Sequence, residues 1–440
     1  MDASQTPTRL RQYKLAAWKY FSPVKTLHEL IETPFNCNPS KFSKQCAPMR
    51  MHRILAEAAL EIISAVFDDQ RVLDRVLAKA FEAHPKWGKR DRSFIAETVF
   101  EVVRWRRALG FLVESDDPAA LCAAQWIRMG YELPDWWSYH GADASTISAR
   151  EELLDGQPRA VRESIPDWLD AYGEAELGEA WPAELSALNQ RTCVYLRVNT
   201  LRATRPEVVA WLAGYNIVAT EVPGLPDALS LMPGKTLTKS LKMDGRVEIQ
   251  DAGSQMIAPI VAPASGDCII DSCAGAGGKT LHLAALMQNQ GRIIGMDIVP
   301  RKLLELERRA KRAGVACLET TVIHPHVLKK YAAAADRILI DAPCSGLGTL
   351  KRQPDLKWRL NAENIERVRQ TQAELLDIYT QMLKPGGHLV YATCSILPSE
   401  NHAQVARLIS KGGFRLIEEH MLSPAATGFD GFYGAKLIKD

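Results

Sequence analysis

Residues 268–280 read Cys-Ile-Ile-Asp-Ser-Cys-Ala-Gly-Ala-Gly-Gly-Lys-Thr, and this stretch decides the fold. A short apolar run ends at Asp271, small residues follow, and an apolar helical pattern begins after Thr280. Short apolar runs bounded by glycine are typical of buried parallel strands. The stretch therefore predicts a strand, a tight turn whose backbone can approach a ligand, and a helix.

The same order of strand, turn and helix continues along the chain. A turn is also expected at Lys384–Gly387, directly before the last of these strands. This alternation predicts an α/β domain over residues 251–440, with a mostly parallel, doubly wound sheet. Further strands are expected at 293–297, 338–341 and 388–391, and helices at 281–287 and 302–312.

The residues before this domain divide into three parts. Residues 51–190 carry apolar side chains at helical spacing and predict an all-α domain, whose third helix is expected to begin at Ser93. Residues 191–250 combine alternating, strand-like segments with one helix and predict a small α+β module. Residues 1–50 are interrupted by prolines and are treated as an extension of unknown role.

Composition excludes several classes of protein. The 440 residues are 47% hydrophobic and carry 54 basic and 52 acidic side chains, a balance typical of globular domains. This net charge neither favours nor excludes an anionic partner, which only local clusters of charge can indicate. The nine cysteines include no C-x-x-C pair, so we expect no metal site and a reducing compartment. No apolar run is long enough for a transmembrane helix, and no signal-peptide core is present, so we expect a cytoplasmic protein without membrane contact.

The glycine-rich turn predicts a nucleotide-type ligand. Asp297 ends the next strand, 26 residues after Asp271, where a carboxylate can accept both hydroxyl groups of a ribose. The spacing Gly275-Ala-Gly-Gly278-Lys279 is too short for a phosphate-binding P-loop. A tight turn without a ligand is the alternative interpretation.

Two cysteines follow predicted strands in polar turns. Residues 341–349 read D-A-P-C-S-G-L-G-T, and residues 391–401 read Y-A-T-C-S-I-L-P-S-E-N. Because ligands bind at the carboxyl ends of parallel strands, Cys344 and Cys394 are expected to lie at one crevice. A thiol near backbone N–H groups or a lysine can act as a nucleophile, whereas a lone cysteine is more often a small buried residue.

These motifs together resemble those of the RNA cytosine-5 methyltransferases. The similarity extends to Val198–Thr200, to Gln250–Gln255 and to the final segment Asp430–Leu437, and covers roughly residues 52–440. The helical part, with its basic segments 88–92 and 102–107, is similar to the NusB-like RNA-binding domain of family members that act on the small ribosomal subunit. The resemblance thus implies an all-α NusB-like domain, a small α+β module and a Rossmann-like methyltransferase domain.

The resemblance also implies cofactor, mechanism and site residues. By this resemblance Cys394 would add to C6 of cytosine as the nucleophile, and Cys344 would assist release of the methylated product, although the residues alone do not rank the two thiols. Asp341 would hydrogen-bond the cytosine edge, and Lys279 would lie near the base and the cofactor. S-adenosylmethionine would be bound by Cys273, Ala274, Gly275, Ala276, Gly277, Gly278, Lys279, Asp297, Arg301 and Asp341.

Two positions depart from the family pattern. Ala276 stands where the family usually has proline, which leaves the turn small. Near His324 no acidic residue stands where the family has one that contacts adenine, and the histidine is expected to be an ordinary loop residue.

Basic side chains near aromatic rings indicate an RNA surface. The candidates are Lys89, Arg90, Arg92, Arg104, Arg106, Arg107, Lys351 and Arg352, with a solvated helix face as the alternative for 104–107. We expect a monomeric enzyme that methylates C5 of cytosine in 16S ribosomal RNA. A tRNA cytosine-5 methyltransferase and a non-catalytic RNA-binding assembly factor remain open.

Overall fold

The computed structural model describes residues 51–137, 143–232 and 236–440. They form two compact units, which are treated separately here. The sheet unit comprises residues 193–344 and 368–440, and the helical unit comprises the described residues up to Thr192 together with 345–367. No helix in these ranges is long and apolar enough to cross a bilayer.

The sheet unit contains a seven-stranded sheet in the order β10-β11-β9-β8-β5-β6-β7. The five strands from β9 to β7 are parallel, whereas β10 and β11 pair antiparallel. This confirms the predicted doubly wound fold. The strands are β5 (Cys268–Asp271), β6 (Arg292–Asp297), β7 (Leu318–Val322), β8 (Ala335–Asp341), β9 (Leu383–Thr393), β10 (Phe414–Leu422) and β11 (Phe432–Lys439).

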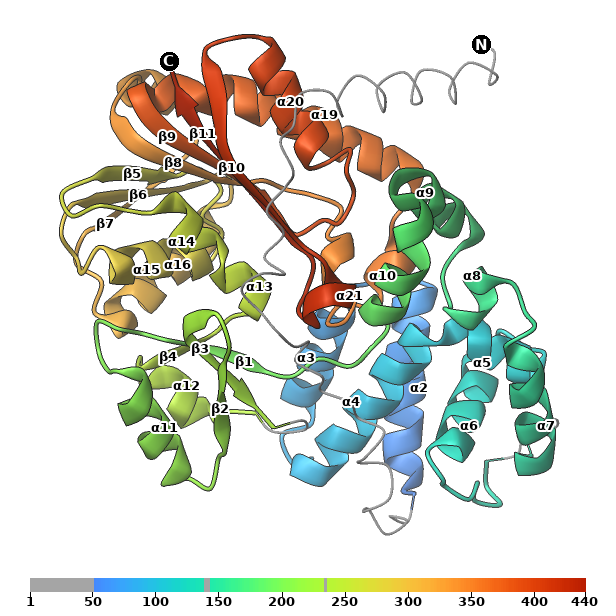
Figure 1. The fold of residues 1–440 in the computed structure, drawn as a ribbon. Coiled ribbons are helices and arrows are strands. Elements are labelled where there is room, and N and C mark those ends of the chain that lie inside the picture. Colours follow the sequence, from blue (N-terminus) through green and yellow to red (C-terminus); the bar gives the residue numbers. More distant parts are fainter. Residues whose placement is uncertain (1–50, 138–142, 233–235) are drawn as a thin grey trace, which may run out of the picture. The chain divides into compact units, whose positions relative to one another are not determined.

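Helices cover both faces of this sheet. In Figure 1, α14 to α16 lie on one face and α19 and α20 on the other, as expected for right-handed crossovers between parallel strands. The strand interiors are almost wholly apolar because both of their faces are covered. The helices are α13 (Ala252–Gln255), α14 (Ile257–Val261), α15 (Gly278–Leu286), α16 (Pro300–Ala313), α17 (Pro325–Lys330), α19 (Ala362–Tyr379), α20 (His402–Ser410) and α21 (Pro424–Thr427).

The predicted turn at Lys384–Gly387 lies inside β9 and does not precede it. Ala335 of β8 pairs with Leu383, and two residues later Arg337 already pairs with His388. The extra residues bulge out of the ladder at Gly386, whose φ of +74° is one that glycine adopts readily. The segment thus contains a left-handed glycine of the kind that a turn uses, but strand pairing continues on both sides of it.

The small module belongs to the same compact unit. Its antiparallel sheet has the order β2-β3-β1-β4, and its core is formed by apolar residues such as Leu196, Leu229 and Val247. This confirms the predicted α+β module. Its elements are β1 (Tyr195–Val198), α11 (Arg205–Ala213), β2 (Ala219–Val222), β3 (Leu225–Leu231), α12 (Lys239–Met243) and β4 (Val247–Ile249).

The helical unit is built around one apolar cluster. Its third predicted helix begins at Lys89 and not at Ser93, because Asp91 accepts the Gly88 N–H (2.8 Å) and so caps the earlier turn. Its helices are α2 (Arg53–Phe67), α3 (Leu73–Ala83), α4 (Lys89–Arg104), α5 (Arg106–Val113), α6 (Pro118–Arg128), α7 (Ala144–Leu154), α8 (Arg159–Arg162), α9 (Asp167–Leu177), α10 (Trp181–Leu188) and α18 (Leu356–Arg359).

Residues 345–367 pack with this helical unit, although their sequence follows a strand of the seven-stranded sheet. Lys357 Nζ donates to the carbonyl of Arg104 (2.7 Å) and to Asn189 Oδ1 (3.1 Å), and Trp358 Nε1 donates to the carbonyl of Val103 (2.7 Å). These bonds satisfy carbonyl groups at the carboxyl end of α4, which lack partners within their own helix. The segment is therefore fixed by helix-end chemistry that its own sequence does not reveal.

We predict that Thr98→Val destabilises the helical unit. Trp126 and Thr98 are both fully buried, and Trp126 Nε1 donates to Thr98 Oγ1 at 2.9 Å. Valine has nearly the same shape but leaves the indole N–H unpaired, which costs about 1–3 kcal/mol. Urea unfolding followed by circular dichroism measures the loss. Thr98→Ser keeps the hydroxyl and should lose less, and equal losses in both variants would contradict the role of this hydrogen bond.

Candidate active site

The glycine-rich loop, defined here as residues 273–278, joins β5 to α15. Gly277 has a φ of +90°, and a Cβ at this position would lie 2.1 Å from Cδ1 of Leu306 on α16. Gly275 is also left-handed, with a φ of +56°. The loop therefore needs glycine both for its conformation and for its close packing on α16.

A cavity of about 470 Å³ lies at this loop, at the carboxyl ends of β5, β6 and β8. Its position agrees with the general placement of ligand sites in parallel sheets. Of the predicted cofactor residues, the cavity is lined by Cys273, Ala274, Gly275, Ala276, Gly278, Lys279, Asp297 and Asp341.

Two predicted cofactor residues do not line the cavity. Gly277 instead packs against Leu306, and Arg301 is exposed at the start of α16. Its neighbour Lys302 lines the cavity and places Nζ 3.5 Å from Asp297 Oδ2. We therefore replace Arg301 with Lys302 as the candidate basic residue at this site, because the helix turns the two side chains in different directions.

Asp297 connects the end of β6 to the glycine-rich loop. Its Oδ2 accepts the Gly275 N–H (3.0 Å), and its Oδ1 accepts the Val299 N–H (2.8 Å). The carboxylate is almost completely buried and still lines the cavity. Each oxygen has a second lone pair, so the group can also accept hydrogen bonds from a ligand.

Asp271, at the end of β5, is a buried carboxyl group with one unpaired oxygen. Thr280 Oγ1 donates to Oδ2 at 2.7 Å, whereas Oδ1 has no partner among the described residues. Burial raises the pKa of Asp271 to about 7, Thr280 and Lys279 oppose this shift, and Asp341 adds to it. The unpaired Oδ1 of Asp271 in the cavity wall therefore favours a ligand that carries a hydrogen-bond donor or a positive charge.

Lys279 and Asp341 form an ion pair between the first and second motifs. Their Nζ and Oδ2 atoms lie 2.7 Å apart, and Lys279 is 8% exposed. Burial by itself would lower the pKa of Lys279, but Asp341, and to a smaller extent Cys394, outweigh burial and raise it. The ammonium group also lies 5.1 Å from the ring centre of Phe432, a cation–π distance. The pair with Asp341 therefore favours the charged form of Lys279 at the cavity.

The two predicted thiols lie side by side. Sγ of Cys344 and Sγ of Cys394 are 3.1 Å apart, and both residues are half-buried. They follow the parallel neighbours β8 and β9. Neither thiol lines the cavity itself, but Pro343, directly before Cys344, does. The pair is thus positioned for chemistry on one bound group.

Gln372 of α19 holds the turns that carry these thiols. Its Nε2 donates to the carbonyl of Pro343 (3.0 Å) and to Oε2 of Glu400 (2.9 Å). Glu400 in turn accepts a bond from the hydroxyl of Ser395 (2.7 Å), next to Cys394. Sequence reasoning missed this fully buried glutamine because it lies in a helix, far from either cysteine motif.

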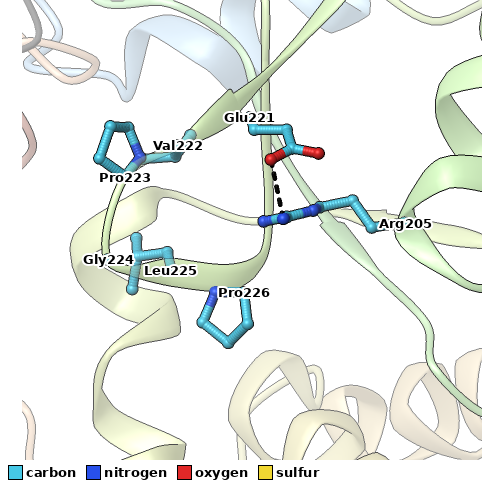
Figure 2. A pocket seen from close by; sticks show the side chains of 7 residues that line it. All are labelled: Arg205, Glu221, Val222, Pro223, Gly224, Leu225 and Pro226. Carbon is cyan, nitrogen blue, oxygen red and sulfur yellow. Dashed lines mark ion pairs between the residues drawn. The ribbon is translucent and has the colours of Figure 1, made fainter.

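A second, more open hollow of about 480 Å³ lies in the small module. Figure 2 shows its wall, which is formed by Arg205, Glu221 and residues 222–226. Nη2 of Arg205 pairs with Oε2 of Glu221 at 2.8 Å. None of the predicted site residues lies here, so the first cavity is the candidate active site.

Comparison with known proteins identifies the family. Residues 258–438 match the family described as 16S rRNA methyltransferase RsmB/F, and residues 165–236 match its ferredoxin-like domain. The chain is 33% identical, over 380 residues, to the probable ribosomal RNA small subunit methyltransferase B of Synechocystis sp., a match that covers 76% of this chain and 84% of that protein. The chain belongs to the RsmB/F family of rRNA methyltransferases. It is therefore an RNA methyltransferase.

Solved structures support the same fold. A methyltransferase homologue from Pyrococcus horikoshii is similar with a TM-score of 0.57 and 26% identity, over 66% of this chain and 99% of that one. The structure of NSun6 from Pyrococcus horikoshii with SFG, an analogue of S-adenosylmethionine, is similar with a TM-score of 0.58 and 22% identity, over 62% of this chain and 98% of that one.

The predicted RNA-binding residues of this family member differ in exposure. Lys89, Arg90 and Arg352 are exposed on the helical unit. Arg92 and Arg107 are half-buried and donate to carbonyl groups of their own unit, at 2.9 Å and 2.7 Å respectively. Arg106 lies over the ring of Phe67, at 4.2 Å from its centre.

The prediction that Arg104 and Lys351 bind RNA is wrong. Both are 3% exposed, and Arg104 Nη2 donates to the carbonyl of Lys351 at 2.9 Å. Burial lowers the pKa of Arg104, and the neighbouring Glu101 opposes this effect. A side chain enclosed in this way cannot reach an RNA phosphate, so we assign Arg104 a structural role at the end of α4.

The apolar part of the cavity wall was not foreseen. Ile298, Ile323, Leu375 and Tyr379 line it, and no acidic side chain from the segment around His324 does so. His324 itself is the exposed residue that precedes α17. Apolar residues that follow strands or lie in helices are too common for their sequence to mark them as wall residues. The described residues also contain no cluster of His, Cys, Asp or Glu that could hold a metal ion.

We predict that Asp271→Asn changes how stability depends on pH. The folded pKa of about 7 lies above the ordinary value of 3.8, so the protonated group stabilises the fold below about pH 4. This stability is lost as the pH rises through 7, by at most about 4 kcal/mol. Relative to the variant, the unaltered protein should therefore lose stability between pH 4 and pH 7.

Urea unfolding of the ligand-free protein at several pH values measures this difference. The exposed Asp69→Asn serves as the matched control. Parallel profiles for Asp271→Asn and the unaltered protein would refute the raised pKa.

Proposed function

We propose that this RNA methyltransferase transfers a methyl group from S-adenosylmethionine to C5 of cytosine in 16S ribosomal RNA. The observation that carries this proposal is the pair of thiols, Cys344 and Cys394, only 3.1 Å apart beside the Lys279–Asp341 ion pair. Methyltransferases that act on nitrogen or oxygen need no thiol, because these atoms carry their own lone pair. A thiol nucleophile is needed where the acceptor is a weakly nucleophilic carbon, and a second thiol beside it can assist release of the product.

Covalent addition makes that carbon reactive. The Cys394 thiolate would form a bond to C6, and the electrons of the C5–C6 double bond would form the bond from C5 to the methyl carbon. The methyl–sulfur bond would break, with its electrons left on the sulfur of the departing S-adenosylhomocysteine. A base then removes the proton from C5, the Cys394–C6 bond breaks, and the double bond is restored with the thiolate as leaving group. We assign Cys344 to this release step, because its sulfur lies beside Cys394.

We propose that Asp341 and Lys279 stabilise the charge that develops on the cytosine ring during the reaction. Asp341 would hydrogen-bond the cytosine edge near N3, where charge develops during addition. Lys279 keeps its positive charge next to this group and near Cys394. Substrate cytosine would have to be unpaired or flipped to reach thiols at a sheet edge.

The cavity residues fit S-adenosylmethionine. Asp297 would accept hydrogen bonds from the ribose, and the unpaired Oδ1 of Asp271 suits the ammonium group of the amino-acid end. The left-handed Gly275 lets the backbone approach the ligand closely. When bound, S-adenosylmethionine supplies the methyl group on a positively charged sulfur. The similar NSun6 structure with SFG supports this choice of cofactor.

We predict opposite phenotypes for the two cysteines. Cys394→Ala should abolish methyl transfer, because no adduct can form. Cys344→Ala should retain addition but accumulate a protein–RNA adduct, because release is impaired. Transfer from labelled S-adenosylmethionine to unmodified 16S ribosomal RNA and a denaturing gel measure both outcomes.

Cys317→Ala is the matched control, since this half-buried thiol is free and lies directly before β7, at the amino end of that parallel strand. Exchanged phenotypes would reverse the two roles. Methyl transfer to tRNA but not to 16S ribosomal RNA would show that the substrate is tRNA and that the proposed substrate is wrong. If the protein neither transferred a methyl group nor bound the cofactor, the proposal would be wrong and the protein would instead be an RNA-binding assembly factor.

We predict that Lys89→Ala with Arg90→Ala weakens RNA binding in a salt-dependent way. Both side chains are exposed at the start of α4. Each cation that contacts a phosphate contributes about 0.7–0.9 to the slope of log K against log salt concentration, so the slope should fall by roughly 1.5. Filter binding to a 16S ribosomal RNA fragment measures it. Arg53→Ala, an exposed change on α2, is the control, and an unchanged slope in the double variant would exclude these two contacts.

A further inference from the structure

We infer that Arg309, held by Glu248, is a positioning residue that fixes the glycine-rich loop for cofactor binding. Arg309 lies on α16 and Glu248 on β4 of the small module, so neither belongs to a motif that predicted the site. The inference rests on the proposed function, because it takes S-adenosylmethionine as the ligand of the loop.

The contact reaches the loop through its backbone. Nη1 of Arg309 donates to the carbonyl of Ala276 at 2.7 Å, and Nη2 of the same side chain donates to Glu248 Oε2 at 2.8 Å. Ala276 lines the cavity. One guanidinium group thus connects a cavity-forming peptide to a carboxylate of a different sheet.

Glu248 orients Arg309 because it is itself fixed. The glutamate is 5% exposed, and its second oxygen accepts a bond from Nη2 of Arg312, one turn further along α16, at 3.0 Å. Side-chain exposure of Arg309 is only 16%. Charge-assisted bonds between largely buried groups are stronger and more rigid than those on a surface.

The hydrogen bond from Arg309 restrains the loop backbone at Ala276, which few other hydrogen bonds hold. Its N–H donates no hydrogen bond to another described residue, and its neighbours Gly275 and Gly277 are the two left-handed glycines. An alanine between two glycines has wide rotational freedom, which the loop would lose on binding a ligand. The bond from Arg309 removes part of this freedom beforehand.

A second restraint acts at the end of the loop. Arg197 of β1, which is 1% exposed, donates to the carbonyl of Gly278 and to Oε1 of Gln250. Burial lowers the pKa of Arg197 to about 10, and Glu248 opposes this shift. Two arginines, neither of which lines the cavity, therefore hold the carbonyl groups of Ala276 and Gly278, which leaves the cavity side of the loop open to a ligand.

This arrangement predicts an effect on binding and not on the chemical step. Arg309 does not line the cavity, so its loss should leave the reacting groups in place once cofactor is saturating. Arg309→Met keeps the length of the side chain and removes its donors. We expect the Kd for S-adenosylhomocysteine, measured by calorimetry, to rise about tenfold, and the KM for S-adenosylmethionine to rise in parallel with kcat changed less than twofold.

Proline at position 276 supplies the decisive comparison. Proline restricts φ covalently and removes no hydrogen bond between described residues, because the Ala276 N–H has no partner among them. If Arg309 acts by restraining this loop, Arg309→Met should raise the Kd about tenfold in the unaltered chain but less than threefold in chains that also carry Ala276→Pro. Such coupling is what a double-mutant cycle detects.

The control is Arg308→Met, one residue earlier on α16, where the side chain is 78% exposed. Glu248→Gln provides a second, milder variant that should raise the Kd in the same direction. Equal binding by Arg309→Met and the unaltered protein, or an equal loss with and without Ala276→Pro, would overturn the positioning role. Failure of the unaltered protein to bind S-adenosylhomocysteine would instead overturn the proposed function, and with it the ligand assumed here.

Discussion

The ion pair between Lys279 and Asp341 is the interaction on which the site depends. Lys279 is in the first turn of α15, and Asp341 ends β8, so the pair connects two motifs that are 62 residues apart. An unpaired ammonium group at the depth of Lys279 would cost several kcal/mol, so Lys279 requires the carboxylate of Asp341, whose own side chain is 29% exposed. The pair sets the distance between the glycine-rich loop and the turn that carries Cys344.

Sheet topology brings the third motif to the same place. β9 lies parallel to β8, so the turn after each strand emerges at the same edge and the two sulfurs meet. Gln372 then ties both turns together from the side. A catalytic arrangement of this kind needs only local turn chemistry from each motif, because the parallel sheet supplies the long-range geometry.

These relations explain how much could be predicted from sequence. Strands β5, β6 and β8, the second part of β9, the loop and both thiols follow from short patterns whose chemistry is local, whereas β7 and β10 were not predicted. The burial of Arg104 could not be predicted, because it depends on Lys351, which lies 247 residues away. Likewise, Lys302 replaces Arg301 at the cavity because of a helical rotation that composition does not encode, and the wall residue Tyr379 lies in an ordinary helix.

The charge of Lys279 acts on both Asp271 at one end of the site and Asp341 at the other. Lys279 interacts with both Asp271 and Asp341, but it forms a direct ion pair only with Asp341. Asp271, without such a partner, takes up a proton at a pH where Asp341 is paired. Any positively charged group that enters beside Asp271 would favour its ionised form and release that proton. A ligand with an ammonium group would therefore complete the charge balance of the cavity, while Lys279 stays paired with Asp341 beside the thiols.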